Sequence, residues 1–367
     1  MSKKSRRGGQ AMAAGQQIAR GLGGPIGSQA EEGVRIDDAF VRLAEKEKAA
    51  IERLQKLRKS KVVVFLASDA VQMRDDIALN LFELLRELGR SDRLDLVIYS
   101  RGGQTEVPAK LVPLIRNYCS HFGVIVPYRA HSAATHIALG ANEIVMGPMS
   151  ELGPVDPSRT HPLLPKDKDG NQIPISVQDL KHVVDLLKRE GPEQSYTPEA
   201  LATIFSTMFE YVHPLAMGAI EQSYALAKLI SMKLLGTHMD PEKEKDQIDR
   251  IANELSDGFK SHLYQIGWEE AKRLGLPVLF DDGDVYSAAW ELYELVVPRL
   301  NQPPDVTGGS KVAGRPIVVM ATEKSKRVLY EFSEVTREGN LTKMRPVGAK
   351  WISSGELKAA EPTAGGS

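Results

Sequence analysis

Residues 123–157, GVIVPYRAHSAATHIALGANEIVMGPMSELGPVDP, carry the most informative pattern in the chain. The apolar run at 124–126 predicts a buried strand, the Ala-rich segment through Leu139 predicts a helix, and residues 143–146 predict a second strand. Ser132 falls between the first strand and the helix, where a hydrolase presents a nucleophile and helix-start N–H groups are free to meet an oxyanion. Alone, Ser132 is more typical of a helix N-cap, because caps far outnumber nucleophiles.

Upstream of this stretch, strand and helix patterns alternate. Apolar runs at 62–66 and 94–99 predict buried strands, and apolar spacing at 74–88 and 106–118 predicts helices. This alternation predicts an α/β fold with mostly parallel strands and crossover helices.

Two glycines, Gly102 and Gly103, follow the predicted strand at 94–99. Glycine permits positive φ and lets backbone N–H groups approach a ligand closely. Open α/β sheets bind ligands beyond the carboxyl ends of their strands, so this loop and Ser132 are expected at the same edge. A plain tight turn is the alternative interpretation of the glycine pair.

Composition excludes several classes of protein. The 367 residues are 42% apolar and 26% charged, with a net charge of −1, which argues against nucleic-acid binding driven by overall charge. The single cysteine, Cys119, excludes an intramolecular disulfide and suits a reducing compartment. The sequence lacks an apolar run of about 18 residues, so we expect no membrane span. The N-terminus lacks a secretory signal pattern, so a cytoplasmic location is expected.

The predicted domain organisation has five parts. A main domain with added helices occupies residues 35–302, and a small β-meander occupies 315–355. The Pro- and Gly-rich residues 303–314 are expected to form a linker. Residues 1–34 and 356–367 have the composition of a disordered arm and tail.

Four motifs together resemble a known family. They are Ser100-Arg101-Gly102-Gly103, Ala130-His131-Ser132-Ala133-Ala134, Gly153-Pro154-Val155-Asp156-Pro157, and Glu269-Glu270-Ala271 running to Gly275-Leu276. The chain resembles the ClpP/crotonase superfamily over roughly residues 60–280. Within it, the chain is most similar to the serine dehydrogenase proteinase family, relatives of the peptidases ClpP and SppA. The resemblance implies a ClpP/crotonase-like spiral of ββα units.

The resemblance also implies a catalytic site. Ser132 matches the nucleophile, and Gly102, Gly103 and Ala133 match the oxyanion-hole positions. Asp156 stands where ClpP keeps its histidine, and His262 precedes the helix that follows the ClpP aspartate, so the two residue types have exchanged places. The family is described with a triad in the order Ser, Asp, His, which Ser132, Asp156 and His262 satisfy; a triad depends on geometry rather than chain order.

Other bases stay open at this point. His213 opens a predicted helix and is an alternative base, and an SppA-like Ser–Lys dyad would use Lys166, Lys168 or Lys181. His131 and His136 are expected to be structural, with His131 also able to shape the site, while His161 and His182 are expected at the surface. The chain lacks a His-Glu-x-x-His motif and a P-loop, so we expect neither a zinc site nor an ATPase; energy-dependent unfolding would need a separate unfoldase.

The sequence therefore predicts a serine peptidase that acts on a peptide or protein through an acyl-enzyme, with no cofactor. Because related proteins assemble into rings, a homo-oligomer is expected; neither nucleic acid nor membrane is an expected partner. The alternative is a catalytically inactive module that keeps the fold for assembly.

Overall fold

The computed structural model describes residues 36–156, 158–159, 162–168, 170–173, 175–176, 182–183, 186, 197–259, 261–306, 311–338 and 341–359. The predicted N-terminal arm and residues 360–367 of the predicted tail fall outside these residues.

An eight-stranded mixed sheet forms the centre of the molecule, with strand order β12-β11-β10-β1-β2-β3-β5-β9. Five strands run parallel: β1 (Lys61–Ala67), β2 (Ser91–Tyr99), β3 (Cys119–Val126), β5 (Glu143–Met146) and β9 (Val278–Phe280). The α/β fold class with parallel strands is therefore confirmed.

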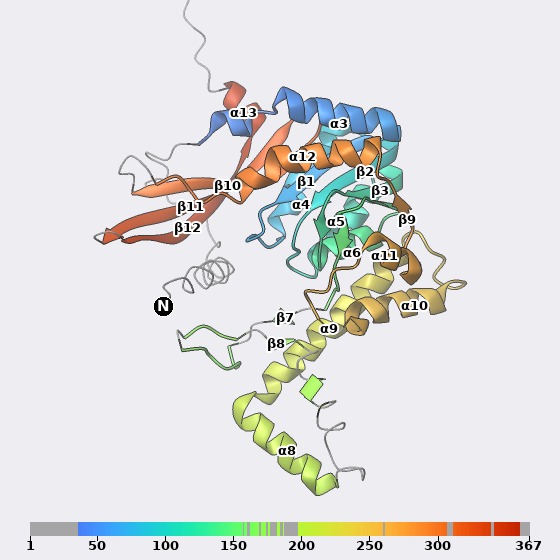
Figure 1. The fold of residues 1–367 in the computed structure, drawn as a ribbon, viewed down its shortest axis with the longest axis vertical. Coiled ribbons are helices and arrows are strands. Elements are labelled where there is room, and N and C mark those ends of the chain that lie inside the picture. Colours follow the sequence, from blue (N-terminus) through green and yellow to red (C-terminus); the bar gives the residue numbers. More distant parts are fainter. Residues whose placement is uncertain are drawn as a thin grey trace, which may run out of the picture.

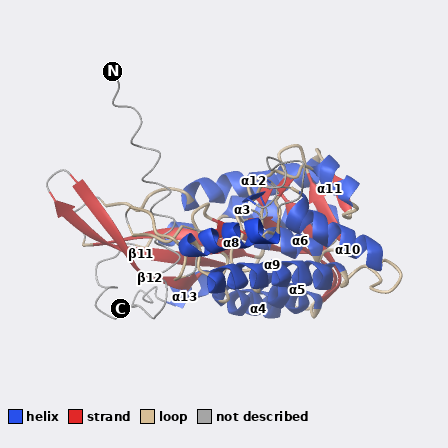
Figure 2. Cartoon of the chain, turned by 90° about the horizontal axis from the view of Figure 1, so that it is seen from below, coloured by secondary structure: helices blue, strands red, loops and turns tan. Residues whose placement is uncertain are grey.

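Helices cover both faces of this sheet (Figure 2). One layer contains α3 (Glu45–Arg58) and α12 (Asp284–Leu300). The other contains α4 (Asp76–Leu88), α5 (Val107–Arg116), α6 (Ala133–Leu139), α9 (Pro214–Leu235), α10 (Lys245–Asn253) and α11 (Trp268–Leu274). The short α2 (Asp38–Val41) and α13 (Ser354–Ala359) lie near the meander, and a π-helical turn, Glu254–Gly258, follows α10.

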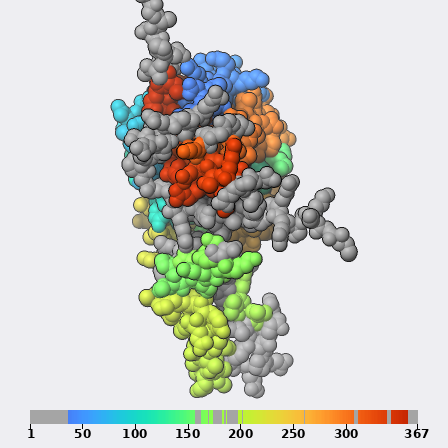
Figure 3. Space-filling view, turned by 90° about the vertical axis from the view of Figure 1, so that its left-hand side faces the viewer, coloured from blue at the N-terminus to red at the C-terminus, as the bar shows by residue number. Residues whose placement is uncertain are grey.

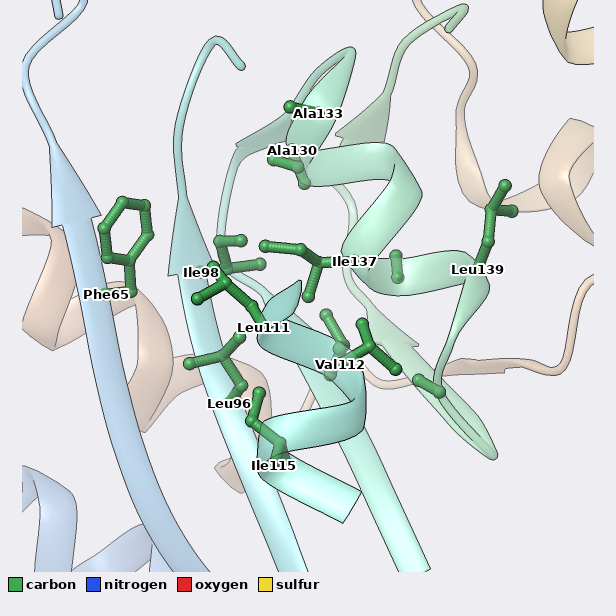
Figure 4. Close-up of a cluster of buried hydrophobic side chains, with 14 of the residues drawn as sticks. Phe65, Leu96, Ile98, Leu111, Val112, Ile115, Ala130, Ala133, Ile137 and Leu139 are labelled. Atoms are coloured by element: carbon green, nitrogen blue, oxygen red, sulfur yellow. The ribbon is translucent and has the colours of Figure 1, made fainter. Parts of the chain in front are cut away.

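Alternate residues of the strands supply the two cores. In β1, Val63 and Phe65 face the α4–α6 layer, whereas Val62 and Val64 face α3 and α12. This is the pattern of a strand buried on both faces, and each fully buried aliphatic side chain contributes about 1.5–3 kcal/mol. Figure 4 shows the first core, in which strand residues meet those of α5 and α6: Phe65, Leu96, Ile98, Leu111, Val112 and Ile137.

The predicted C-terminal β-meander is confirmed, and it extends the central sheet. Its strands are β10 (Val312–Ala321), β11 (Lys326–Glu338) and β12 (Leu341–Ser353). β10 pairs antiparallel with β1, and β11 and β12 follow in order. β10 begins within the range predicted as a linker, because Val312 and Ala313 already pair with β11. The division of the chain into domains remains a prediction.

A helical arm projects from the body. α8 (Pro198–Tyr211) and the first half of α9 form the yellow-green part that extends below the sheet in Figures 1 and 3. The two-stranded β7 (Ser158–Arg159) and β8 (Ile175–Ser176) lie beside α9.

A second, small layer of strand pairing lies at the carboxyl ends of the parallel strands. β4 (Arg129–Ala130) pairs with β6 (Glu151–Leu152), and isolated bridges join Ser100 to Ala130, Met73 to Gly103 and Leu152 to Ile266. These pairings gather the loops that hold the predicted site residues.

Candidate active site

Ser132 occupies the turn between β4 and α6 with an unusual backbone conformation. Its φ of 52° and ψ of −113° make it one of two described non-glycine residues with positive φ. It stands at the N-cap position, yet its side chain makes no capping hydrogen bond. Such a conformation costs about 1–3 kcal/mol and persists only where surrounding contacts impose it. The helix-cap interpretation of Ser132 therefore does not hold, because the hydroxyl is not used as a cap.

Backbone hydrogen bonds hold this turn in place. The His131 N–H donates to the Ser100 carbonyl at 3.0 Å, and the Ala134 N–H donates to the His131 carbonyl at 2.9 Å. Ser132 is half-buried on this turn, and in α/β-hydrolases a sharp strand-to-helix turn likewise presents the nucleophilic serine.

The two-glycine loop lies directly against Ser132. A Cβ atom on Gly102 would lie 2.7 Å from the Ser132 Cβ and 2.8 Å from the His131 carbonyl oxygen, and Gly102 has a φ of 101°. Its N–H donates to the Ser100 Oγ at 3.1 Å. On Gly103, a Cβ would lie 2.2 Å from the Met73 N. Both positions require glycine, one for close approach to the serine and the other for pairing with Met73.

Two backbone donors border this turn. Within the part of the chain that the structure describes, the N–H groups of Gly103 and Ala133 donate to no protein acceptor. Both residues lie next to Ser132 or the loop packed on it. Paired N–H groups of this kind can stabilise a negative oxygen.

Asp156 and His262 are joined by a hydrogen bond, 3.0 Å between the Asp156 Oδ1 and the His262 Nδ1. The Asp156 carboxylate is buried, whereas the His262 side chain is 38% exposed. The bond to Asp156 is the main cause of a raised His262 pKa, against the opposing effect of burial.

Two pairs of segments hold this contact in place. Leu152 and Ile266 exchange N–H···O bonds of 2.9 Å, and the Val155 N–H donates to the Leu255 carbonyl at 2.9 Å. The loops around Asp156 and His262 therefore converge, as the predicted triad requires.

Ser132 and His262 are not hydrogen-bonded to one another in the part of the chain described here. They share a neighbour, His131, whose pKa is lowered in part by the charge of His262. Active-site hydrogen bonds are often long before substrate binds and shorten in the substrate complex. The structure thus joins two of the three predicted residues, Asp156 and His262, by a hydrogen bond, whereas the position of Ser132 relative to them remains a prediction.

His131 belongs to a second group of charged side chains. Its Nε2 lies 3.2 Å from the Glu151 Oε1, without hydrogen-bond geometry, and Glu151 accepts from the Arg129 Nε at 2.7 Å. Burial, with further effects of Arg101, Arg129 and His262, lowers the pKa of His131 to about 4. His131 is therefore neutral at pH 7, so it adds no positive charge beside His262.

His136 is packed in the core. Its Nε2 lies 3.1 Å from the Ala227 carbonyl of α9, and burial lowers its pKa to about 4. This is the structural role expected from the sequence.

The other candidate bases lie elsewhere. His213 caps α9, where its Nδ1 accepts the Leu215 N–H at 3.1 Å, and the side chain is exposed at the end of α9 remote from α6. Lys166 and Lys168 are exposed on the loop between β7 and β8, and His182 is exposed too. Lys181 and His161 lie outside the described residues.

One buried hydroxyl near the site was missed from the sequence. Thr135, in the first turn of α6, is fully buried and lies within hydrogen-bond distance of Ala130 and Gly153. The available signal was a pair of polar residues, Thr135 and His136, within an otherwise apolar stretch, where a buried hydroxyl needs a partner.

Two absences concern the described residues. None of their helices is long and apolar enough to cross a membrane. Among them, too, the histidine, cysteine and acidic side chains form no group of three or more that could hold a metal ion.

A serine turn, a two-glycine loop and an acid–histidine pair lie at one edge of the α/β sheet, and these are the features that the motifs predicted. Residues 40–162 match the family described as "ClpP-like SDH-type serine proteinase". The resemblance predicted from the motifs is therefore confirmed.

Two curated relatives are uncharacterized proteins of Methanocaldococcus jannaschii. MJ0137 is 25% identical over 224 residues, which is 60% of this chain and 65% of the relative. MJ1495 is 23% identical over 213 residues, which is 58% of this chain and 60% of the relative. The matched part is thus less than two thirds of the length of either relative.

Solved structures that resemble the chain include a mutant ClpP1 from Listeria monocytogenes, with 13% identity, coverage of 63% of this chain and 98% of that chain, and a TM-score of 0.32. Another is a mutant of the 1510-N membrane-bound stomatin-specific protease, with 16% identity, coverage of 61% and 82%, and a TM-score of 0.33.

Proposed function

We propose that this chain is a serine peptidase that hydrolyses peptide bonds through an acyl-enzyme, with Ser132 as nucleophile, His262 as base and Asp156 as the residue that orients the base. The observation that carries the proposal is the hydrogen bond of 3.0 Å between the His262 Nδ1 and the Asp156 Oδ1, across 106 residues of chain. A carboxylate on Nδ1 fixes the tautomer in which Nε2 can accept a proton.

The reaction would follow the general course of serine hydrolases. As the Ser132 Oγ attacks the carbonyl carbon, the His262 Nε2 takes its proton, and Asp156 stabilises the imidazolium that results. His262 then gives this proton to the leaving amine, so that the C–N bond breaks and the acyl group stays on Ser132. A water molecule, deprotonated by the same nitrogen, releases the acid and restores the hydroxyl.

We assign the oxyanion donors to the N–H groups of Gly103 and Ala133, which are unpaired within the described part of the chain. Gly102 supplies the close approach to Ser132, while its own N–H is used by the Ser100 Oγ. Loss of one such donor typically lowers kcat by about 100- to 1000-fold. The substrate is a peptide or protein, and the arrangement requires no cofactor.

Labelling with a fluorophosphonate, which reacts with activated serines, tests the proposal. We expect the native chain to be labelled on Ser132, and the Ser132→Ala form neither to be labelled nor to cleave peptides from a mixed library. Ser287→Ala is a matched control, because Ser287 is exposed on α12 and donates only to the Gly283 carbonyl at 2.7 Å. If the native chain is not labelled and cleaves no peptide, the inactive assembly module becomes the better description.

A further inference from the structure

The geometry assigns a positioning role to Thr135: its buried hydroxyl joins the nucleophile helix to the loop of Asp156 and so keeps the carboxylate on His262. The expected effect on catalysis rests on the proposed function, whereas the contact between the Thr135 hydroxyl and Gly153 does not.

Thr135 connects three segments through one oxygen atom. Its Oγ1 lies 2.7 Å from the Ala130 carbonyl and 2.9 Å from the Gly153 carbonyl, and it accepts the Gly153 N–H at 3.1 Å. A hydroxyl donates only one hydrogen at a time, so the arrangement that satisfies most groups has Gly153 donating to Thr135 and Thr135 donating to one carbonyl. All of these atoms are buried, where an unpaired polar group is costly.

This contact has a specific mechanical consequence for Asp156. Only Pro154 and Val155 separate Gly153 from Asp156, and the proline restricts the backbone on both sides of it. At the other end of this short segment, the Val155 N–H is bound to the Leu255 carbonyl. Asp156 is thus held from two sides. Gly153 is bound to α6, whose N-cap is Ser132, and Val155 is bound to the segment that leads to His262.

The hydrogen bonds of the Thr135 hydroxyl among the described residues go to Ala130 and Gly153 and not to a proposed catalytic side chain, so its effect acts through backbone position. Among the described residues, Asp156 and His131 are the titratable groups that interact electrostatically with His262, and Asp156 is hydrogen-bonded to it. If the Asp156 loop shifts, His262 loses the bond that raises its pKa.

The test uses Thr135→Val, which keeps the shape of the side chain and removes the hydroxyl. The first readout is the titration of the His262 imidazole by NMR in the full chain, assigned by comparison with His262→Gln. We expect Thr135→Val to lower the His262 pKa and Thr135→Ser, which retains the hydroxyl, to leave it near the native value. The second readout is peptide cleavage, for which kcat should fall about 100-fold with little change in KM, the scale expected for a small misplacement of catalytic groups.

Thr237→Val is a matched control, because Thr237 follows α9 and contacts Gly140 at the C-terminal end of α6. The Thr237 Oγ1 lies 2.6 Å from the Leu234 carbonyl and 3.2 Å from the Gly140 carbonyl, so the substitution also removes a hydroxyl that ties α9 to α6. We expect it to leave the His262 titration and kcat unchanged. An unchanged His262 pKa in Thr135→Val, or an equal fall in Thr237→Val, overturns the inference. Because the titration does not require catalysis, a chain that fails the fluorophosphonate test still tests Thr135.

Discussion

The Nδ1 of His262 lies 3.0 Å from the Oδ1 of Asp156, although 106 residues separate them. Asp156 is buried and His262 is partly exposed, so the carboxylate lies behind the imidazole and the ring faces outward. A buried carboxylate that orients an accessible imidazole is the arrangement that a general base requires. The predictions below follow from this pair and from the contacts around it.

The first prediction concerns pH. The hydrogen bond to Asp156 raises the pKa of His262, and the base must be neutral to accept a proton, so kcat/KM should rise with pH through a value above that of an ordinary histidine, about 6.5. In Asp156→Asn this rise should move to lower pH, while kcat falls about 10,000-fold because the tautomer is no longer fixed. Steady-state kinetics from about pH 5 to about pH 9, which spans the ordinary pKa of histidine, measures both effects. A profile that does not move in Asp156→Asn contradicts the assignment.

The hydrogen bond between His262 and Asp156 should also make the unfolding free energy depend on pH. A histidine whose pKa is higher in the folded state stabilises the fold fully at pH values below its unfolded pKa, and this contribution is lost as pH rises through the folded pKa. The difference in unfolding free energy between the native chain and Asp156→Asn should therefore shrink as pH increases through the His262 pKa. Urea unfolding at a series of pH values measures it, and a difference that grows with pH would exclude the pair as its source.

A second prediction concerns the contact between the two-glycine loop and the nucleophile. In Gly102→Ala the new Cβ would come 2.7 Å from the Ser132 Cβ, and the backbone has a φ of 101°. We expect fluorophosphonate labelling to slow about 100-fold or more, because the serine turn must move. Gly89→Ala is the matched control, since it has a φ of 74° but its Cβ would meet only the Lys61 Nζ, at 3.6 Å. Equal labelling rates in the two variants would show that the contact is unimportant.

A third prediction concerns how the meander is fastened to the body. The buried Lys326 of β11 donates to both oxygens of Glu47 in α3, at 2.8 and 2.9 Å, and lies 4.2 Å above the ring of Phe40. Lys326→Met leaves the Glu47 carboxylate buried without its partner, so the chain should lose about 3–5 kcal/mol of stability. The double variant Lys326→Met with Glu47→Leu should recover most of this loss. Denaturant unfolding measures the loss of stability in each single variant and in the double variant. A loss in the double variant equal to the sum of the two single losses would rule out a coupled pair.

A fourth prediction concerns a glycine that serves stability rather than catalysis. A Cβ on Gly123 would lie 1.9 Å from the Oδ1 of Asp95. The other oxygen of this carboxylate, Oδ2, accepts a hydrogen bond from the Arg58 Nε at 3.0 Å. Gly123→Ala should therefore disturb this buried ion pair and lower the melting temperature, whereas the labelling rate of the folded fraction stays native. Calorimetry with labelling of the same sample distinguishes the two effects, and an unchanged melting temperature would contradict the packing described.

The sequence could predict β1, β2, β3 and β5 because each contains a continuous apolar run, as in 62–66, which lies within β1. It did not predict that β3 begins at Cys119, because residues 119–123 mix polar and apolar types and lack either periodicity. The joining of β10 to β1 could not be predicted, since pairing between strands so distant in the chain leaves no local pattern.

The residues of the candidate site also differ in how far the sequence alone could predict them. The positions of Ser132 and the glycines predict two turns at one edge of the sheet, although each pattern alone is equally typical of a helix cap or a tight turn. Asp156 and His262 became visible only through the order of family motifs, since neither differs locally from a turn or helix-end residue. Thr135 was missed because its importance depends on what its hydroxyl meets in space, namely Gly153.

The most direct test of the central claim is the rate at which a fluorophosphonate labels the native chain and His262→Gln, with the labelled residue located by mass spectrometry. We predict labelling of Ser132 in the native chain and a rate lower by about 1,000-fold or more in His262→Gln, because the serine is then without its base. Labelling of Ser132 at the native rate in His262→Gln, or labelling at another serine, would contradict the account.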